Sequence, residues 1–219
     1  MPRVVKPRRY SSPLRADQAR LTSKAIVDAA VSLFSEKGYA AVSLDAIAEA
    51  AGVSRATVFT SVGGKPEVLK ASFQATFGRA AGAEGVAMPF VDRPKSVEVR
   101  ARATAAGYLA GYAAICTELH SHMARVFEAI REGSRADDAV NALWIEVNEE
   151  RRRGASTIVA DVKARTRLRA GLDEDDAADI VWLLNDPVHF HMLVHGRGWS
   201  PAKFQAWLTR ALELELIGR

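Results

Sequence analysis

Residues 25–69 read AIVDAAVSLFSEKGYAAVSLDAIAEAAGVSRATVFTSVGGKPEVL, and the rest of the interpretation follows from this segment. Its apolar residues recur at spacings of three and four, which place them on one face of an α-helix. Gly38 and Gly52 interrupt the pattern at points where helices are expected to end, because glycine tolerates the left-handed backbone of a helix terminus. The segment therefore predicts a series of short helices.

Residues that favour helix starts precede these helices. Ser43 and Ser54 can cap the second and third helices, because a serine hydroxyl accepts hydrogen bonds from free N-terminal amides. Thr22 or Ser23 can cap the first helix, and Pro66 suits the first position of a fourth. In the third helix we expect the valines to face inward and the polar side chains outward.

Three short helices with a glycine turn between the second and the third predict a helix-turn-helix, whose third helix fits the major groove of DNA. Arg55 can donate two hydrogen bonds to guanine, and Lys65 with the free amides beside it can hold a phosphate. Hydroxyls that can bond phosphates or bases stand at Thr57, Thr60 and Ser61. The same pattern also fits a capped helix that is merely solvated.

The positive charge of the chain lies at its N-terminal end. Residues 1–70 contain 11 Lys and Arg against 6 Asp and Glu, whereas residues 71–219 contain 19 against 20. This asymmetry favours a polyanionic partner, with nucleic acid ahead of a membrane because the segment has no apolar face. We expect residues 1–20 to form a basic, disordered arm, although basic tails are often only solvated.

Composition excludes several other classes of protein. The chain has 219 residues, of which 48% are hydrophobic, so it can bury a sizeable core. A single cysteine, Cys116, excludes an internal disulfide. No apolar stretch follows the basic start, and the longest uncharged run, Ala103 to Thr117, is too short to cross a bilayer. We therefore predict a cytoplasmic protein with no membrane contact.

A change of composition at residues 82–95, rich in Gly and Pro, predicts a boundary between a small module and a larger domain. We expect a DNA-binding domain at 21–70 and a ligand-binding and dimerisation domain at 71–219, joined by the fourth helix. In the larger domain the periodicity predicts helices over 96–114, 116–133, 136–169, 174–195 and 201–217. Pro187 is expected to kink the fourth of these and to open a space beside it. The fold class is all-α.

The segment from Ala25 to Leu69 closely resembles the DNA-binding module of the tetracycline-repressor (TetR) family of bacterial transcription regulators. The elements AA..LF.E.GY, IA..AGVS and T.F....K occur in order. The resemblance implies an all-helical homodimer on palindromic double-stranded DNA, a four-helix bundle between subunits and a cavity for a small-molecule effector. It also implies that DNA contacts come from Ser43, Ser54, Arg55, Thr57, Thr60, Ser61 and Lys65.

Two positions depart from the family pattern. Phe59 stands where a tyrosine is most common, so stacking against sugar and backbone replaces a hydrogen bond to phosphate. Val62 replaces a common aromatic residue and is followed by Gly63 and Gly64, which predicts looser packing of the third helix on the fourth. Neither change removes the surface that would read the groove.

Aromatic and polar residues on the expected cavity helices suit a mainly apolar ligand. The predicted ligand residues are Tyr108, Tyr112, Cys116, Met123, Phe127, Trp144, Trp182, His189 and Phe190. The last two helices carry more apolar surface than one small domain needs, which favours a dimer interface. The predicted dimer residues are Ile180, Leu184, Phe204, Trp207, Leu208 and Ala211. In both sets the residues could instead pack within one chain.

No cofactor, metal site or catalytic residue is assigned. His191 and His195 share a helical face, but a third metal ligand is missing from the pattern. No nucleophile is placed beside a base by its position in the sequence. Two alternatives remain open, namely an enzyme with a histidine-lined site and a ligand-binding or interaction module that has lost DNA binding.

Overall fold

A computed structural model describes residues 13–80 and 93–218 of the chain. All regular elements in these two ranges are helical, which confirms the predicted all-α fold class. Residues 1–12 of the predicted arm, and most of the predicted boundary at 82–95, lie outside the described residues.

The N-terminal part contains four helices, α1 (Pro13–Lys37), α2 (Leu44–Ala50), α3 (Arg55–Ser61) and α4 (Lys65–Ala80). The predicted caps form, because the hydroxyls of Ser43 and Ser54 accept hydrogen bonds from backbone amides in the first turns of α2 and α3. Gly38 and Gly52 have φ angles of 73° and 67°, the left-handed conformation that their positions predicted.

The first helix starts earlier than its sequence indicated. Thr22 and Ser23 lie inside α1 and do not cap it, because the helix already begins at Pro13, a residue suited to a first helical turn. Residues 13–20, predicted as part of a disordered arm, are therefore helical. The hydroxyl of Thr22 instead donates to the carbonyl of Gln18, four residues earlier.

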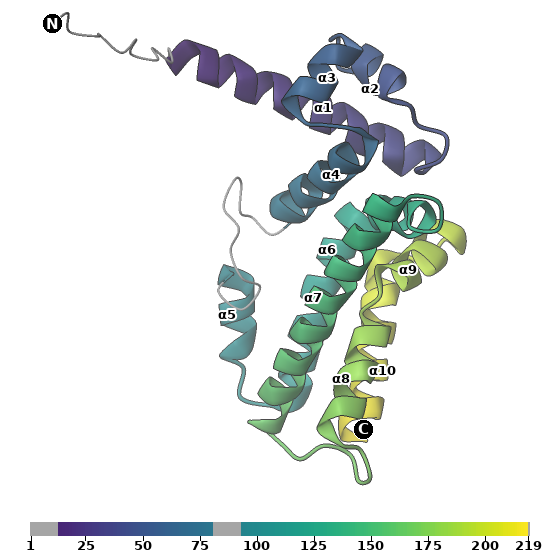
Figure 1. The fold of residues 1–219 in the computed structure, drawn as a ribbon. Helices are drawn as coiled ribbons and strands as arrows, with labels where there is room; N and C mark the ends of the chain where they lie inside the picture. The colour runs from purple at the N-terminus through teal and green to yellow at the C-terminus, as the bar shows by residue number, and fades with distance from the viewer. Residues whose placement is uncertain (1–12, 81–92, 219) are drawn as a thin grey trace, which may run out of the picture.

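The C-terminal part contains α5 (Pro94–Arg100), α6 (Ala105–Gly133), α7 (Asp138–Lys163), α8 (Glu174–Leu184), α9 (Pro187–Phe190), the π-helical segment η2 (His191–Gly196) and α10 (Pro201–Ile217). The long helices α6 and α7 run side by side, and α8 and α10 lie together along one side of them (Figure 1). The prediction of a helix at 201–217 is confirmed.

Four predicted helices of this part have different bounds. The helices expected at 96–114 and 116–133 are instead α5 and an unbroken α6, because the chain turns at 101–104 and Thr104 caps α6. The helix expected at 136–169 ends at Lys163. The helix expected at 174–195 is interrupted at Asn185 and Asp186, where Asp186 caps α9 and Pro187 opens it.

One hydrophobic core is shared between the N-terminal helices and the following domain. It combines Ile26 and Phe34 of α1 and Val58 of α3 with Phe127 of α6 and Leu143 of α7. Its members thus come from both sides of the predicted boundary between residues 70 and 71. Because apolar burial is the main favourable term in folding, this core fixes the N-terminal helices against α6 and α7.

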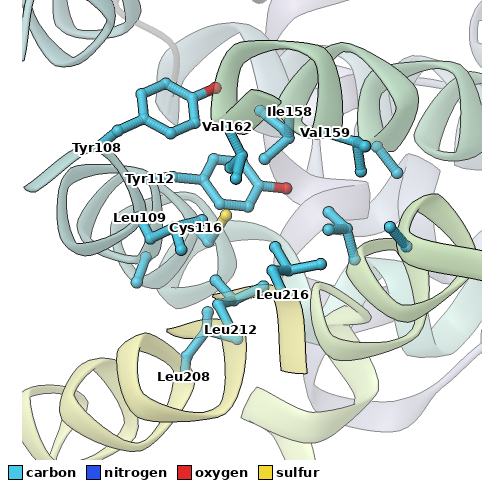
Figure 2. Close-up of a cluster of buried hydrophobic side chains, with 14 of the residues drawn as sticks. Tyr108, Leu109, Tyr112, Cys116, Ile158, Val159, Val162, Leu208, Leu212 and Leu216 are labelled. Atoms are coloured by element: carbon cyan, nitrogen blue, oxygen red, sulfur yellow. The ribbon is translucent and has the colours of Figure 1, made fainter. Parts of the chain in front are cut away.

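A second core lies at the other end of α6, where side chains of α6, α7 and α10 meet (Figure 2). Leu109 of α6, Val162 of α7 and Leu212 of α10 are fully buried there. The rings of Tyr108 and Tyr112 lie between the helices, and the hydroxyl of Tyr108 donates to Asp161 at 2.9 Å. The contact satisfies a polar group that would be costly to bury alone.

Among the described residues, no helix combines the length and the apolar composition that a membrane crossing requires.

Because one core joins the two parts, we expect the chain to unfold in a single cooperative transition. Phe127 is fully buried in this core, and Phe127→Ala should lower the free energy of unfolding by about 3–5 kcal/mol. Urea denaturation followed by circular dichroism and tryptophan fluorescence measures this loss. Phe59 is 64% exposed, so Phe59→Ala should change the free energy by less than about 0.5 kcal/mol. Two separate transitions in the wild-type protein would contradict the shared core.

Candidate DNA-binding surface and ligand cavity

Helix α3 lies at the end of the molecule opposite to the chain's C-terminus (Figure 1). Its inward residue, Val58, is fully buried, whereas Arg55, Phe59, Thr60 and Ser61 are exposed. Thr57, also on α3, is partly exposed. One buried valine thus anchors a helix whose remaining surface faces solvent, as a groove-reading helix requires.

Hydroxyl groups on this surface are partly committed to the protein itself. The Oγ atoms of Ser43 and Ser54 each accept a backbone N–H at 3.1 Å. The hydroxyls of Ser54 and Thr57 lie 2.8 Å apart, and the Thr60 hydroxyl donates to the Ala56 carbonyl at 2.9 Å. The caps fix the starts of α2 and α3, and the predicted DNA contacts of these residues stay predictions.

Arg55 forms an ion pair with Asp45 across the turn between α2 and α3. Its Nη1 lies 2.9 Å from Asp45 Oδ2, and both side chains are about two-thirds exposed. Exposed pairs of this kind contribute only about 0.2–1 kcal/mol, so the guanidinium can exchange Asp45 for a base or a phosphate at small cost. The pair holds Arg55 over the surface of the helix-turn-helix.

Lys65 is less available than its sequence position suggested. Its Nζ lies 4.0 Å from the centre of the Tyr39 ring, and burial lowers the pKa of its ammonium group. Contact between a lysine ammonium and an aromatic face is favourable in itself. A phosphate contact from Lys65 therefore requires this side chain to leave the ring.

The turn between α1 and α2 is held by the junction of α6 and α7. The backbone amides of Tyr39 and Ala40 donate to the Glu132 carboxylate at 3.0 and 3.3 Å, and the Tyr39 hydroxyl donates to Asp137 at 2.8 Å. Burial and this hydrogen bond raise the pKa of Tyr39, and the same bond lowers the pKa of Asp137. Charge-assisted hydrogen bonds therefore connect the DNA-binding helices to the C-terminal part.

A cavity of about 310 Å³ lies between α4, α6, α7 and the break that follows α8. Phe73 and Phe77 of α4 and Leu119 and Met123 of α6 form part of its apolar wall. The remaining lining residues are Arg93, Tyr112, Cys116, His120, Glu146, Val147, Glu150, Arg151, Gly154, Ile158, Asn185 and Pro187. This composition, apolar with a few polar groups, is typical of small-molecule sites.

His120 is the most deeply buried polar side chain of this wall, with 2% of its surface exposed. Burial, together with the nearby positive charge of Arg151, lowers the pKa of His120 to about 3. The imidazole is therefore neutral at physiological pH. Arg151 is held by Asp186 at 3.2 Å and by the carbonyl of Trp182 at 2.8 Å, and burial lowers its pKa.

The cysteine and the histidines offer little reactive chemistry. Burial raises the pKa of the Cys116 thiol to about 12, which suppresses the thiolate that acts as a nucleophile. Within the part of the chain that the structure describes, no group of three His, Cys, Asp or Glu residues is arranged to hold a metal ion.

Three of the nine predicted ligand residues, Tyr112, Cys116 and Met123, line the cavity. The others lie outside its lining, with Phe127 and Trp144 paired in the shared core at 5.3 Å between ring centres. Tyr108 and Phe190 are buried in the second core, Trp182 packs against that core, and His189 contacts the edge of Trp207. An aromatic residue at helical spacing gives no information on whether it borders a cavity or fills a core.

Several lining residues were not predicted. His120 was not among the predicted ligand residues, and Asn185 and Arg151 carry no pattern that marks a cavity wall. Pro187 gave a usable signal, since the space expected beside it exists and Pro187 borders it. The residues from α4 enter the wall only through the contact between α4 and α6.

The predicted dimer residues divide into two groups. Phe204 and Leu208 are fully buried inside their own chain, where they complete the second core. The prediction that they lie in the dimer interface is therefore wrong, because no surface of these side chains is left for a second subunit. Ile180, Leu184, Trp207 and Ala211 are partly exposed. Leu183 and Leu214, which were not predicted, are 55% and 58% exposed on α8 and α10. These two leucines lie beside the predicted residues that are partly exposed, since Leu183 follows Ile180 by three residues and Leu214 follows Ala211 by three.

In this chain α3 is exposed, is capped by Ser54 and follows a turn at Gly52. This arrangement is typical of helix-turn-helix DNA-binding folds. The family model described as "Bacterial regulatory proteins, tetR family" matches residues 26–71. The resemblance to the TetR family is thereby confirmed for the N-terminal segment. No curated protein sequence matches the chain.

Solved structures of transcription regulators share the fold over nearly the whole chain. NalD of Pseudomonas aeruginosa, the secondary repressor of the MexAB-OprM efflux pump, has 20% identity and a TM-score of 0.64, with 90% of this chain and 98% of NalD covered. A Saccharomonospora viridis protein in complex with choline has 18% identity and a TM-score of 0.67, with 93% and 100% covered. FadR of Bacillus subtilis in complex with stearoyl-CoA has 19% identity and a TM-score of 0.65, with 90% and 98% covered.

The buried imidazole predicts a specific dependence of stability on pH. An unfolded histidine has a pKa near 6.5, whereas His120 titrates at about 3 in the folded protein. Between these values only the unfolded chain binds the proton, so stability is full above pH 6.5 and falls as the pH is lowered. From pH 7 to pH 5 the loss is about 2 kcal/mol.

Replacing His120 by glutamine, which does not titrate, should reduce the decline in unfolding free energy between pH 7 and pH 5 by about 2 kcal/mol. Urea denaturation at the two pH values measures it. His122 is exposed on the same helix, and His122→Gln serves as the control, expected to keep the wild-type decline. An unchanged decline in the His120 variant would show that this imidazole is not buried as described.

Proposed function

We propose that this protein is a dimeric, sequence-specific DNA-binding transcription regulator, a repressor that releases DNA when a small molecule occupies its cavity. The observation that carries the proposal is the open face of α3, led by Arg55 and anchored by the buried Val58. The match of residues 26–71 to a family of bacterial regulators supports it.

Two copies of α3 would read successive turns of the major groove. Seven residues, Arg55–Ser61, form this helix, which is too short to contact more than a few base pairs alone. Two-fold related subunits read half-sites about 34 Å apart, and the operator is then palindromic. The partly exposed apolar side chains of α8 and α10, centred on Leu183 and Leu214, supply the surface on which the second copy packs.

The cavity is placed to affect the DNA-binding helices. Phe73 and Phe77 belong to α4, which follows α3 after only three residues, and they form part of the cavity wall. A ligand that requires these side chains to move shifts α4, and therefore the spacing of the two reading helices. Release of DNA requires the ligand to bind the mis-spaced conformation more tightly than the DNA-bound one. Among structures with the same fold, two were solved with choline or stearoyl-CoA.

Arg55→Ala should weaken binding to the operator by about 1–3 kcal/mol. The variant should also lose the preference for one particular base pair in each half-site, the pair that Arg55 contacts. The measurement is a fluorescence-anisotropy titration of DNA from beside the protein's own gene and of a random duplex, at several salt concentrations. The wild-type affinity should fall steeply with salt and saturate at one dimer per site.

The matched control is Arg153→Ala, which removes an exposed arginine of α7 that pairs with Glu150. Its affinity for the operator should equal that of the wild-type protein. Equal losses on operator and random duplex for the Arg55 variant would refute base reading by this residue. Absence of any DNA binding at low salt would refute the proposed function.

Leu214→Glu should weaken the dimer, because a charge would be buried in the subunit interface without a partner. Sedimentation velocity should show a dimer for the wild-type protein and a shift toward monomer for the variant, with a parallel loss of operator binding. Ile145→Glu, at a side chain of α7 that is 50% exposed, is the control and should remain dimeric. Dimerisation unaffected by Leu214→Glu would place the interface elsewhere.

A further inference from the structure

Among the described residues, the histidine and the asparagine of the cavity wall each have a buried polar atom without a hydrogen-bond partner of ordinary geometry. These atoms are Nδ1 of His120 and Oδ1 of Asn185, and both residues line the cavity. The two side chains are near each other: a hydrogen-bond interaction with Asn185 acts to raise the pKa of His120, against the larger effect of burial, although neither atom has a partner at ordinary hydrogen-bond geometry. Buried polar atoms in proteins almost always have a partner, so these two atoms indicate where a bound molecule places a polar group.

The charged side chains of the wall are already balanced by the protein. Glu146 pairs with Lys70 at 2.8 Å, and Glu150 pairs with Arg153 at 2.6 Å.

The two arginines of the wall are also engaged. Arg151 pairs with Asp186 at 3.2 Å, and the guanidinium of Arg93 lies 4.4 Å from the centre of the Phe77 ring. The wall therefore contains two positive and two negative side chains, each in contact with a protein partner. A charged ligand would lose its hydration on entering this space. The charged side chains of the wall would not compensate for this loss, because each already contacts a partner within the protein.

One uncharged group can satisfy both unpaired atoms. A hydroxyl donates a hydrogen bond to Asn185 Oδ1 and accepts one from an N–H at His120 Nδ1. A carboxylate only accepts and would leave Asn185 Oδ1 without a donor. An ether or a ketone has the same deficiency. The neutral imidazole also provides no charge to attract an anion.

The volume and the apolar lining of the cavity indicate what the rest of the ligand, apart from its hydroxyl, is like. Its volume is about 310 Å³, near the lower end of the range of roughly 300–1,000 Å³ for small-molecule sites. Phe73, Phe77, Leu119 and Met123 supply aromatic and flexible apolar surface. Flat apolar molecules pack well against such side chains.

From these observations we propose that the effector is an uncharged, hydroxyl-bearing, mainly aromatic molecule of about two fused rings, whose hydroxyl lies between His120 and Asn185. The proposal rests on the proposed function, since it names the ligand of the same cavity. A site of this kind differs from one that selects a carboxylate or a quaternary ammonium group, because it binds an uncharged hydroxyl.

The test uses the full-length protein and four probes at pH 7, measured by isothermal titration calorimetry. The probes are 2-naphthol, 2-methoxynaphthalene, 2-naphthoate and choline. We expect 2-naphthol to bind at least tenfold more tightly than each of the others. The methoxy compound keeps the rings and the acceptor but lacks the donor, so it isolates the hydrogen bond to Asn185. A higher or equal affinity for any of the other three probes would overturn the proposal.

Variants locate the hydroxyl. Asn185→Leu keeps a similar volume and should remove the preference for 2-naphthol over 2-methoxynaphthalene, and His120→Phe should weaken 2-naphthol at least tenfold. His189→Phe is the control, because His189 also has an unpaired Nδ1 but does not line the cavity. Circular dichroism checks that each variant is folded. If His120→Phe does not fold, the probe ranking on the wild-type protein and the Asn185 variant still decide the question.

Operator binding without ligand is measured in parallel and separates the two proposals. If DNA binds and none of the four probes does, the ligand proposal is overturned and the proposed function stands. If 2-naphthol binds with the expected preference and DNA does not bind, the proposed function is overturned and the chemistry of the cavity stands.

Discussion

Burial of α6 along most of its length is the interaction on which the rest of the structure depends. Phe127 and Ile130 near its C-terminal end enter the core shared with the DNA-binding helices, and Leu109 and Ala113 nearer its start enter the second core. Because α6 is continuous from Ala105 to Gly133, the two cores share one rigid element. The core that holds the N-terminal helices and the wall of the cavity therefore share α6.

Two connections link the cavity to the DNA-binding surface. Phe73 and Phe77 border the cavity from α4, and α4 begins shortly after the reading helix ends. At the other side, Glu132 binds the backbone of the turn between α1 and α2.

Local features of the N-terminal helices were predictable because they depend on neighbouring residues. Ser43 and Ser54 cap the helices that follow them, and Gly38 ends α1, since each effect acts over one helical turn. The start of α1 and the break at residues 101–104 were not found. Residues 15–20 are exposed and show no apolar periodicity that would mark the start of α1, and the turn at 101–104 contains no glycine or proline. Hydrogen bonds such as the cap at Thr104 decide where a helix begins. The presence of a mainly apolar cavity was predicted, but only three of the nine predicted ligand residues line it. His120 and Asn185, which also line it, were not among the nine.

The amino-acid sequence by itself determined the all-helical class, the helix-turn-helix, and the residues on the outer face of α3. These properties follow from spacing, caps and glycines, which act within a few residues. Only the tertiary structure decided that Phe204 and Leu208 are buried in their own chain while Leu183 and Leu214 remain exposed. It also decided which residues border the cavity. The physical reason is that helical periodicity marks a face as apolar but contains no information on which distant helix will cover it.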